Sequence, residues 1–214
     1  MKIFFTRHGE SEANILRELS NRGLKHPLTQ AGREQAAIIA DTLRDQTITH
    51  IYSSPLLRAI ETSIIIATVL RIGYEVNDAL REYDLGALEG RVDEEAWNQW
   101  QRIFDSWSKH QRREEKIPGG ENFHEVRDRF VPFIDRLVQE HKNNQANLLI
   151  VSHGGLYAHM LPLVLKNISS EFILKRSGFA YTEVIIAELI NDRLVCTEWG
   201  GVKLPSDSKQ FEAI

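Results

Sequence analysis

The sequence has a single cysteine, few prolines and no long hydrophobic run. Cys196 is the one cysteine among 214 residues, so an intrachain disulfide is excluded, and its strand-like surroundings predict a thiol buried as a small hydrophobic group. The 6 prolines are not gathered with glycine and serine into a linker. No apolar run reaches transmembrane length, and strand-like sequence begins two residues from the start, leaving no room for a signal peptide. We therefore expect a cytoplasmic location.

A surplus of positive charge is also missing. The chain carries 26 Lys and Arg against 30 Asp and Glu, a formal net charge of −4. This balance argues against general affinity for nucleic acid or for an anionic membrane, so neither is expected as a partner. A site for an anion must then be a local cluster of cations. The length and the 42% of hydrophobic residues are typical of one well-packed domain.

Strand and helix patterns alternate along the chain, which predicts an α/β fold with a mostly parallel sheet. Short β-favouring runs predict strands, and apolar residues at helical spacing predict helices. Thr29 is expected to cap one helix, and Pro55 to occupy the first helical position of the next. The predicted strands are 3–6, 48–53, a weak 74–77 and 148–151, and the predicted helices are 29–43, 55–70 and a segment from 154 to about 165.

The second half of the chain adds a helical insertion and an antiparallel edge. Helical patterns before and after Pro118-Gly119-Gly120 predict an inserted helical pair over about 92–143. Two β-favouring runs, 181–189 and 194–199, predict a hairpin at the sheet edge. We expect a single domain over 1–199 and a C-terminal tail over 200–214.

Two of the predicted strands end in a histidine followed by glycine. Thr6 leads into Arg7-His8-Gly9, and Val151 leads into Ser152-His153-Gly154. Ligands of parallel sheets bind outside the carboxyl ends of the strands, so both histidines are candidates for one pocket. Cations and histidines gathered there point to phosphoryl transfer.

Five ordered sequence blocks resemble the histidine phosphatase superfamily, also called phosphoglycerate mutase-like. The resemblance extends from Lys2 to about Glu198 and implies a three-layer αβα sandwich with the helical insertion over the active site. The blocks are Arg7-His8-Gly9-Glu10-Ser11 with Asn14; Pro27-Leu28-Thr29 with Gly32; Ser53-Ser54-Pro55 with Arg58-Ala59 and Thr62; Leu80-Arg81-Glu82 with Gly86, Glu89-Gly90 and Pro118-Gly119-Gly120-Glu121; and Ser152-His153-Gly154-Gly155.

The resemblance implies that His8 is the nucleophile, because a neutral imidazole nitrogen can attack phosphorus when the other ring nitrogen donates a hydrogen bond. Arg7 and Arg58 supply planar forks that grip phosphate oxygens. His153 adds a further contact to the phosphate. The backbone amide at Gly154 lies near a predicted helix start and adds a donor. By resemblance, the Asn14 position also contacts the phosphate.

Glu82 takes the position of the acid in the same resemblance. A carboxyl near a dianionic phosphate has a raised pKa, which keeps it protonated for donation to the leaving oxygen and then lets it activate water. Asp84 and Glu121 are the next candidates for this role.

No cofactor and no metal ion are expected. The remaining histidines match no block, and no pair of them shows the helical spacing of a zinc motif. We interpret them as structural or exposed side chains; they are His26, His50, His110, His124, His141 and His159.

Four aromatic residues form one stripe on the predicted helix after Val92: Trp97, Trp100, Phe104 and Trp107. Such a stripe more often packs into a core than binds a ligand. Because the family often places this insertion over the active site, part of the stripe lining the substrate pocket is the alternative. An aromatic wall would favour an organic phosphate over a highly charged one.

We therefore expect a phosphomonoester hydrolase that acts on a small organic phosphate through a phosphohistidine. The first alternative is a cofactor-dependent phosphoglycerate mutase. It is disfavoured because Arg112-Arg113 is followed by acidic Glu114-Glu115 and then by a run that resembles the phosphatase branch. The second alternative is a non-catalytic protein that binds phosphorylated ligands. The sequence does not select a particular ester or an oligomeric state.

Overall fold

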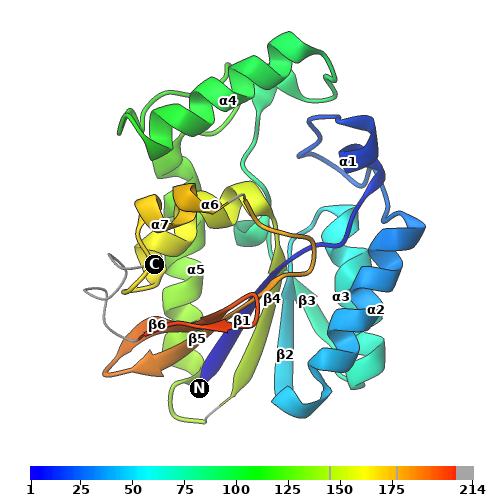
Figure 1. Cartoon of the computed structure of the whole chain (residues 1–214), viewed down its shortest axis with the longest axis vertical. Helices are drawn as coiled ribbons and strands as arrows, with labels where there is room; N and C mark the ends of the chain where they lie inside the picture. Colours follow the sequence, from blue (N-terminus) through cyan, green and yellow to red (C-terminus); the bar gives the residue numbers. More distant parts are fainter. Residues whose placement is uncertain (145, 177, 206–214) are drawn as a thin grey trace.

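The computed structural model describes residues 1–144, 146–176 and 178–205 (Figure 1). Within them, a seven-stranded sheet has the order β3-β2-β4-β1-β5-β6-β7. The four strands from β3 to β1 are parallel to one another, and β5, β6 and β7 continue the sheet antiparallel. The strands are β1 Lys2–Arg7, β2 Ile48–Ser53, β3 Tyr74–Val76, β4 Asn147–Ser152, β5 Val184–Ile190, β6 Arg193–Trp199 and β7 Val202–Lys203.

Helices cover both faces of the sheet. Thr29 caps α2, its side chain accepting a hydrogen bond from the Gly32 backbone N–H, as the sequence predicts. Asn122 and Glu125 form a reciprocal capping box at the start of α5. The α-helices are α1 Glu12–Leu16, α2 Gln30–Thr42, α3 Leu57–Leu70, α4 Glu94–Ser108, α5 Phe123–His141, α6 Gly154–Val164 and α7 Ser170–Lys175, and the short 3₁₀ helices are η1 Arg44–Gln46, η2 Asp78–Leu80 and η3 Gly86–Leu88.

Alternation along β1 divides the core into two layers. Phe4 packs with the buried side chains of α2 and α3, whereas Ile3 and Phe5 pack with those of α5 and α6. All three are fully buried, and each contributes about 1.5–3 kcal/mol of transfer free energy. The predicted fold class, a three-layer α/β sandwich with an antiparallel edge, is confirmed. Cys196 on β6 is buried as predicted, and burial raises the pKa of its thiol to about 12.

The predicted helical insertion divides between two locations. Helix α4 stands apart from the sheet at the top of the molecule, while α5 runs along the sheet in the same layer as α6 (Figure 1). The hydrophobic face of α5, including Phe130 and Leu137, is therefore part of the main core. Of the predicted pair, α4 is the helix that reaches the candidate site.

Two local expectations need revision or extension. Helix α3 begins at Leu57, so the prediction that Pro55 occupies its first helical position is wrong. The Ser54 backbone N–H donates to the carbonyl of Val151, and the Ser54 hydroxyl accepts from the Leu56 N–H, which holds this segment as a turn instead. The predicted tail begins with β7, which pairs with β6; from residue 206 onward it lies outside the described residues.

None of the helices in the described part of the chain is long and apolar enough to cross a membrane. The cytoplasmic location stays a prediction.

Candidate active site

The ends of β1 and β4 bring two buried histidines together. The strands pair in parallel with Arg7 opposite Ser152, and the His8 backbone N–H donates to the Ser152 carbonyl at 3.0 Å. The ring centroids of His8 and His153 consequently lie 5.1 Å apart, and both side chains are buried. Their proximity follows directly from the parallel register, as the strand ends predict.

The tautomer of His8 follows from its hydrogen bonds. Its Nδ1 lies 2.7 Å from the Gly9 carbonyl, which can only accept, so Nδ1 carries the proton. Nε2 then keeps its lone pair and accepts from Arg58 Nε at 3.1 Å. Burial, followed by the charges of Arg58 and Arg7, lowers the pKa of His8 well below its usual range. His8 is therefore a neutral imidazole with its nucleophilic nitrogen directed toward a guanidinium.

Two arginines supply the positive charge of the site, of which Arg58 is buried and Arg7 is half-buried. Burial lowers the pKa of Arg58 to about 10, so this guanidinium stays charged at neutral pH. A second guanidinium nitrogen of Arg58 donates to Asn21 Oδ1 at 3.4 Å. Arg7 donates to the Phe179 carbonyl at 2.6 Å, and its Cζ lies 4.2 Å from the centroid of the Tyr181 ring. Cations held largely out of water need an anionic partner, so the pocket is suited to an anionic ligand.

Ser54 fixes the orientation of His153. The Ser54 hydroxyl accepts from the Leu56 N–H and lies 2.6 Å from His153 Nε2, in a hydrogen bond whose direction depends on the tautomer of the ring. The other ring nitrogen, Nδ1, is buried and has no hydrogen-bond partner in the described structure, so it is the nitrogen left for a ligand. Burial and the nearby cations, Arg58 first among them, lower the pKa of His153 well below its usual range. His153 is thus a neutral imidazole at neutral pH.

Glu82 lies in the same cavity as His8 and the two arginines. Its carboxylate oxygens accept hydrogen bonds from the backbone N–H groups of Tyr83 at 3.0 Å and Gly155 at 2.9 Å. Burial outweighs these contacts and the charge of Arg58, and raises the pKa of this carboxyl. A Cβ on Gly155 would come within 2.7 Å of the Tyr83 ring and 2.8 Å of a Glu82 oxygen, so a larger residue here would displace one of these side chains.

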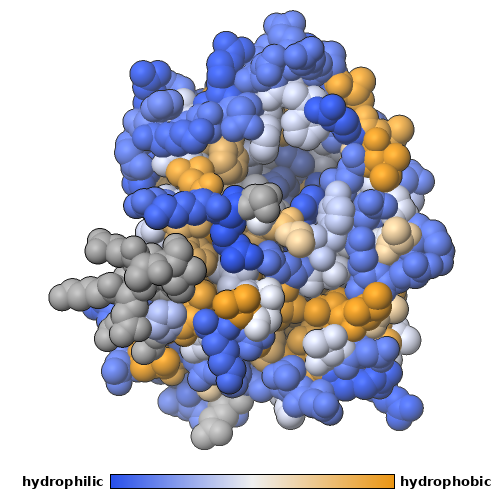
Figure 2. All heavy atoms as spheres, in the orientation of Figure 1, coloured by the Kyte–Doolittle hydropathy of each residue, from blue (hydrophilic) through white to orange (hydrophobic). Residues whose placement is uncertain are grey.

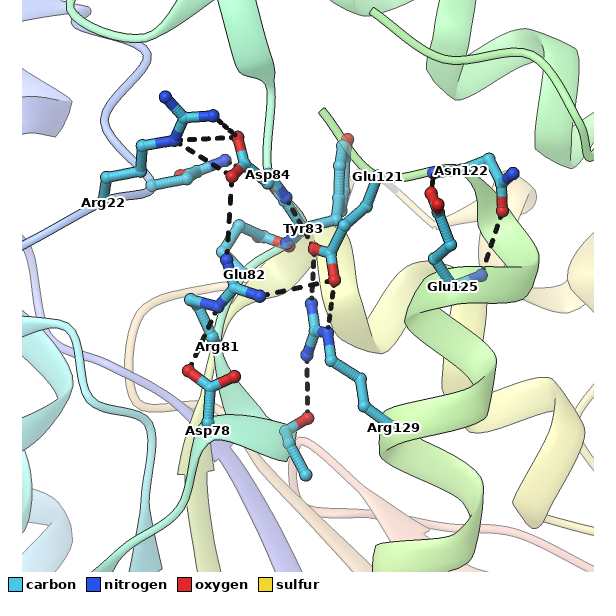
Figure 3. Close-up of polar contacts among 12 residues, drawn as sticks. Arg22, Asp78, Arg81, Glu82, Tyr83, Asp84, Glu121, Asn122, Glu125 and Arg129 are labelled. Atoms are coloured by element: carbon cyan, nitrogen blue, oxygen red, sulfur yellow. Dashed lines mark hydrogen bonds and ion pairs between the residues drawn. The ribbon is translucent and has the colours of Figure 1, made fainter. Parts of the chain in front are cut away.

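The other two candidate acids take part in a polar network behind Glu82 (Figure 3). Glu121 is paired with Arg129 at 2.8 Å and accepts from the Asp84 backbone N–H at 2.8 Å. Asp84 is paired with Arg22 at 2.8 Å, and its side chain accepts from the Gly86 N–H. Neither carboxylate lines the cavity. They hold the loop that carries Glu82 and are poorly placed to serve as the acid.

Asn14 and Gly154 line the cavity as well. The Asn14 side-chain oxygen accepts from the Ser11 backbone N–H and hydroxyl at 3.0 and 2.8 Å, which leaves its amide N–H₂ as the group for a ligand. Gly154 begins α6, where backbone N–H groups favour an anion. All the predicted residues except His153 line the cavity, and His153 contacts the ring of His8.

Asn21 and Ser54 were not predicted as parts of the site. Asn21 accepts from Arg58 and donates to the Tyr83 carbonyl at 2.9 Å, so it links Arg58 to the Glu82 loop. Ser54 lies inside a sequence block, but its hydrogen bond to His153 joins residues 99 positions apart. Only the folded chain reveals either contact.

The cavity extends from these polar groups to a wall of aromatic side chains. It has a volume of about 410 Å³ and opens beneath α4, where the surface is hollowed (Figure 2). Trp97, Trp100 and Phe104 form this wall, whereas Trp107 is buried in the core. The favoured prediction, core packing, is therefore right for Trp107. Trp97, Trp100 and Phe104 instead line the cavity, as the alternative prediction has it for part of the stripe.

Histidines outside the site fit the structural role expected of them. His159 is enclosed by Tyr83, Phe104, Trp107 and Phe123, and burial lowers its pKa to about 3. Buried His26 lies 3.0 Å from a Glu18 oxygen. Within the described residues, no three His, Cys, Asp or Glu side chains are grouped to hold a metal ion.

Two histidines and two arginines thus lie at the carboxyl edge of a doubly covered α/β sheet, the edge at which ligands of such sheets bind. The chain belongs to the histidine phosphatase superfamily (branch 1), whose family model matches residues 3–201. It is 35% identical over 158 residues to phosphoglycerate mutase-like protein 4 of Arabidopsis thaliana, covering 72% of this chain and 67% of that protein. It is 32% identical over 171 residues to the probable phosphoglycerate mutase GpmB of Proteus mirabilis, covering 77% and 75%.

A solved structure shares the fold. The mycobacterial glucosyl-3-phosphoglycerate phosphatase in complex with VO3 superimposes with a TM-score of 0.78 at 23% identity, covering 94% of this chain and 99% of that one.

Proposed function

We propose that this protein is a phosphomonoester hydrolase that acts on a small organic phosphate through a phosphohistidine at His8. The observation that carries the proposal is the geometry of His8. Its protonated Nδ1 is held by the Gly9 carbonyl, and its unprotonated Nε2 faces the guanidinium of Arg58. A neutral, oriented imidazole beside a fixed cation is what an attack on a phosphate dianion requires.

The first step forms the phosphoenzyme. His8 Nε2 attacks phosphorus, the bond from phosphorus to the ester oxygen breaks, and the Glu82 carboxyl gives its proton to the departing alkoxide. Arg7, Arg58 and the Nδ1–H of His153 hold the phosphoryl oxygens, with the Asn14 amide and the Gly154 N–H as further donors. The raised pKa of Glu82 supports its role, because the acid must be protonated when the alcohol leaves.

The second step returns the free enzyme. Ionised Glu82 takes a proton from a water molecule, the water oxygen attacks phosphorus, and the bond from phosphorus to Nε2 breaks. Glu82 is then protonated and His8 is neutral, as at the start. No metal ion or cofactor enters either step, because the arginines carry the charge stabilisation that a metal supplies in other phosphatases.

A phosphoglycerate mutase is the second candidate, and the names of the two similar relatives favour it. In a mutase the phosphoryl group on His8 would return to a phosphoglycerate instead of passing to water. The structure gives one argument against it, because the Arg112-Arg113 pair takes no part in the cavity. Arg112 is paired with Glu115 at 3.4 Å, and Arg113 lies 4.6 Å from the centroid of the Phe123 ring.

Product analysis separates the candidates. Purified protein is incubated with a panel of phosphate esters, with release of inorganic phosphate and interconversion of phosphoglycerates measured in parallel. Phosphate release without interconversion is the expected result. Interconversion that outpaces phosphate release would establish the mutase, and tight binding of esters without either reaction would establish a non-catalytic phosphate-binding protein.

A further inference from the structure

The cavity wall opposite the phosphate-binding groups is a fixed aromatic surface. Trp97 and Trp100 make an edge contact with ring centroids 5.4 Å apart, and Trp100 and Phe104 are 5.5 Å apart. Trp97 Nε1 donates to the Arg17 carbonyl at 2.8 Å, which ties α4 to the end of α1. Phe104 rests on buried His159 at 4.7 Å. The wall is therefore held at both ends before any ligand arrives.

Among the described residues that line this half of the cavity, none offers a free positive charge, and Arg17 lies outside the lining with its Cζ 5.7 Å from the centroid of the Trp97 ring. Arg176 is the one cation there among the described lining residues, and it is paired with Glu183 at 2.8 Å and lies against the Trp199 ring. The remaining charged side chain is Glu18, an anion that Lys25 contacts at 2.8 Å. A carboxylate or second phosphate on the alcohol would be desolvated here without a cation to receive it.

Apolar side chains complete this half of the cavity. Leu19 and Leu85 line it from loops, Ala158 lines it from α6, and Leu174 lines it from α7. A flat ring entering the space would meet aromatic faces and aliphatic groups, and would leave no buried polar atom of its own unpaired.

We propose that the physiological substrate is the phosphate monoester of an uncharged alcohol that carries a flat apolar ring, and that this ring lies against Trp97, Trp100 and Phe104. This inference rests on the proposed hydrolysis and names its substrate class. The aromatic wall and the neutralised charge of Arg176 are independent observations that lead to the same class.

The test compares three esters of primary alcohols whose leaving groups are similar: ethyl phosphate, 2-carboxyethyl phosphate and 2-(2-naphthyl)ethyl phosphate. The wild type should show a kcat/KM for the naphthyl ester at least about tenfold above that for ethyl phosphate. This factor is the gain expected from one or two aromatic contacts with the ring. The carboxyethyl ester should be the poorest. Equal values for the three esters, or the highest value for the carboxyethyl ester, would overturn the proposal.

Variants of α4 locate the effect. Trp100→Ala should bring the ratio of naphthyl to ethyl ester close to one, and Trp100→Phe should restore most of it. Asn98 is exposed on the same helix and outside the cavity, so Asn98→Ala is the matched control and should keep the wild-type ratio. A ratio that survives Trp100→Ala would remove the wall from the binding site.

A binding measurement separates this inference from the proposed function. Tryptophan fluorescence is titrated with 2-(2-naphthyl)ethylphosphonate and with ethylphosphonate, which cannot be hydrolysed. At least about tenfold tighter binding of the naphthyl compound supports the substrate class even if no ester is turned over, in which case the hydrolase proposal alone fails. Equal affinities would reject the substrate class while leaving hydrolysis intact.

Discussion

The two halves of the cavity differ in origin and in chemistry. The phosphate half is formed where β1 and β4 end, and its groups are polar: His8 and Arg58 are buried, and Glu82 is half-buried. The other half is formed by α4 and the region around α7, and its surface is aromatic, aliphatic and partly exposed. In the proposed function the sheet edge supports the reaction, while a helix outside the sheet supports selection of the alcohol. The two halves should respond differently to substitution.

The largest expected effect lies in the phosphate half. His8→Ala removes the proposed nucleophile and should lower kcat/KM for every ester by at least about 10⁴-fold, since loss of a covalent nucleophile is rarely compensated. His110 is exposed and does not line the cavity, so His110→Ala should keep wild-type turnover. Near-normal hydrolysis by His8→Ala would show that the phosphate half works by another mechanism.

Glu82 should have an effect that depends on the leaving group. Glu82→Gln keeps the shape of the side chain but has no proton to transfer as an acid, and should slow phosphorylation by an alkyl ester by roughly 10²- to 10⁴-fold. An aryl ester, whose phenolate leaves readily, should lose much less. Single-turnover phosphorylation with one alkyl and one nitrophenyl ester gives the two values. Equal losses would exclude Glu82 as the acid.

The pH dependence sharpens the same test. Burial raises the pKa of Glu82, so the protonated form persists to higher pH than in water and is lost as pH rises through that pKa. The rate of phosphorylation by an alkyl ester should therefore fall on the alkaline side of the profile, and Glu82→Gln should remove this limb. Asp84→Asn, a change in the network behind the site, should retain it.

The phosphate half could largely be predicted from sequence, since its residues follow strand ends whose register fixes where they meet. The grouping of Arg7, His8 and His153 in one pocket could be predicted from the strand ends alone, although the roles of these residues stay predictions. The contacts of Asn21 and Ser54 could not be foreseen, because they join distant segments. Pro55 was misplaced for a related reason: the Ser54 hydroxyl is engaged by His153 and by the turn, so the helix starts later.

The sequence alone did not decide whether the aromatic stripe packs into the core or lines a cavity. A helical stripe of Trp97, Trp100, Phe104 and Trp107 has the same period whether it faces a core or a cavity. Only the position of α4, apart from the sheet, decides that three of these side chains line the cavity and one is buried.

His159 tests how firmly the aromatic half is supported. Its pKa falls from 6.5 to about 3 on burial, so the unfolded chain binds its proton first as the solution is acidified. The contribution of neutral His159 to stability is complete above pH 6.5 and decreases as pH falls toward 3. His159→Phe should therefore reduce the loss of unfolding free energy between pH 7 and pH 5 by about 2 kcal/mol, measured by urea denaturation. An unchanged loss would show that His159 is not buried as described.

Metal removal should have the smallest effect. Since the proposed mechanism places the charge stabilisation on Arg7 and Arg58, dialysis against EDTA should leave kcat/KM for an alkyl ester unchanged within error. The control is the same protein assayed after added Mg²⁺ or Zn²⁺. Complete loss of activity in EDTA, restored by a divalent ion, would contradict the metal-free mechanism.

Trapping of the phosphoenzyme tests the central claim most directly. Wild-type protein is mixed with a ³²P-labelled ester for a single turnover, quenched in alkali and digested, and the labelled peptide is sequenced. The account predicts an acid-labile, alkali-stable label on His8 that forms before inorganic phosphate appears and is absent in His8→Ala. Phosphate release at the wild-type rate with no label on His8, or with the label on another residue, would contradict it.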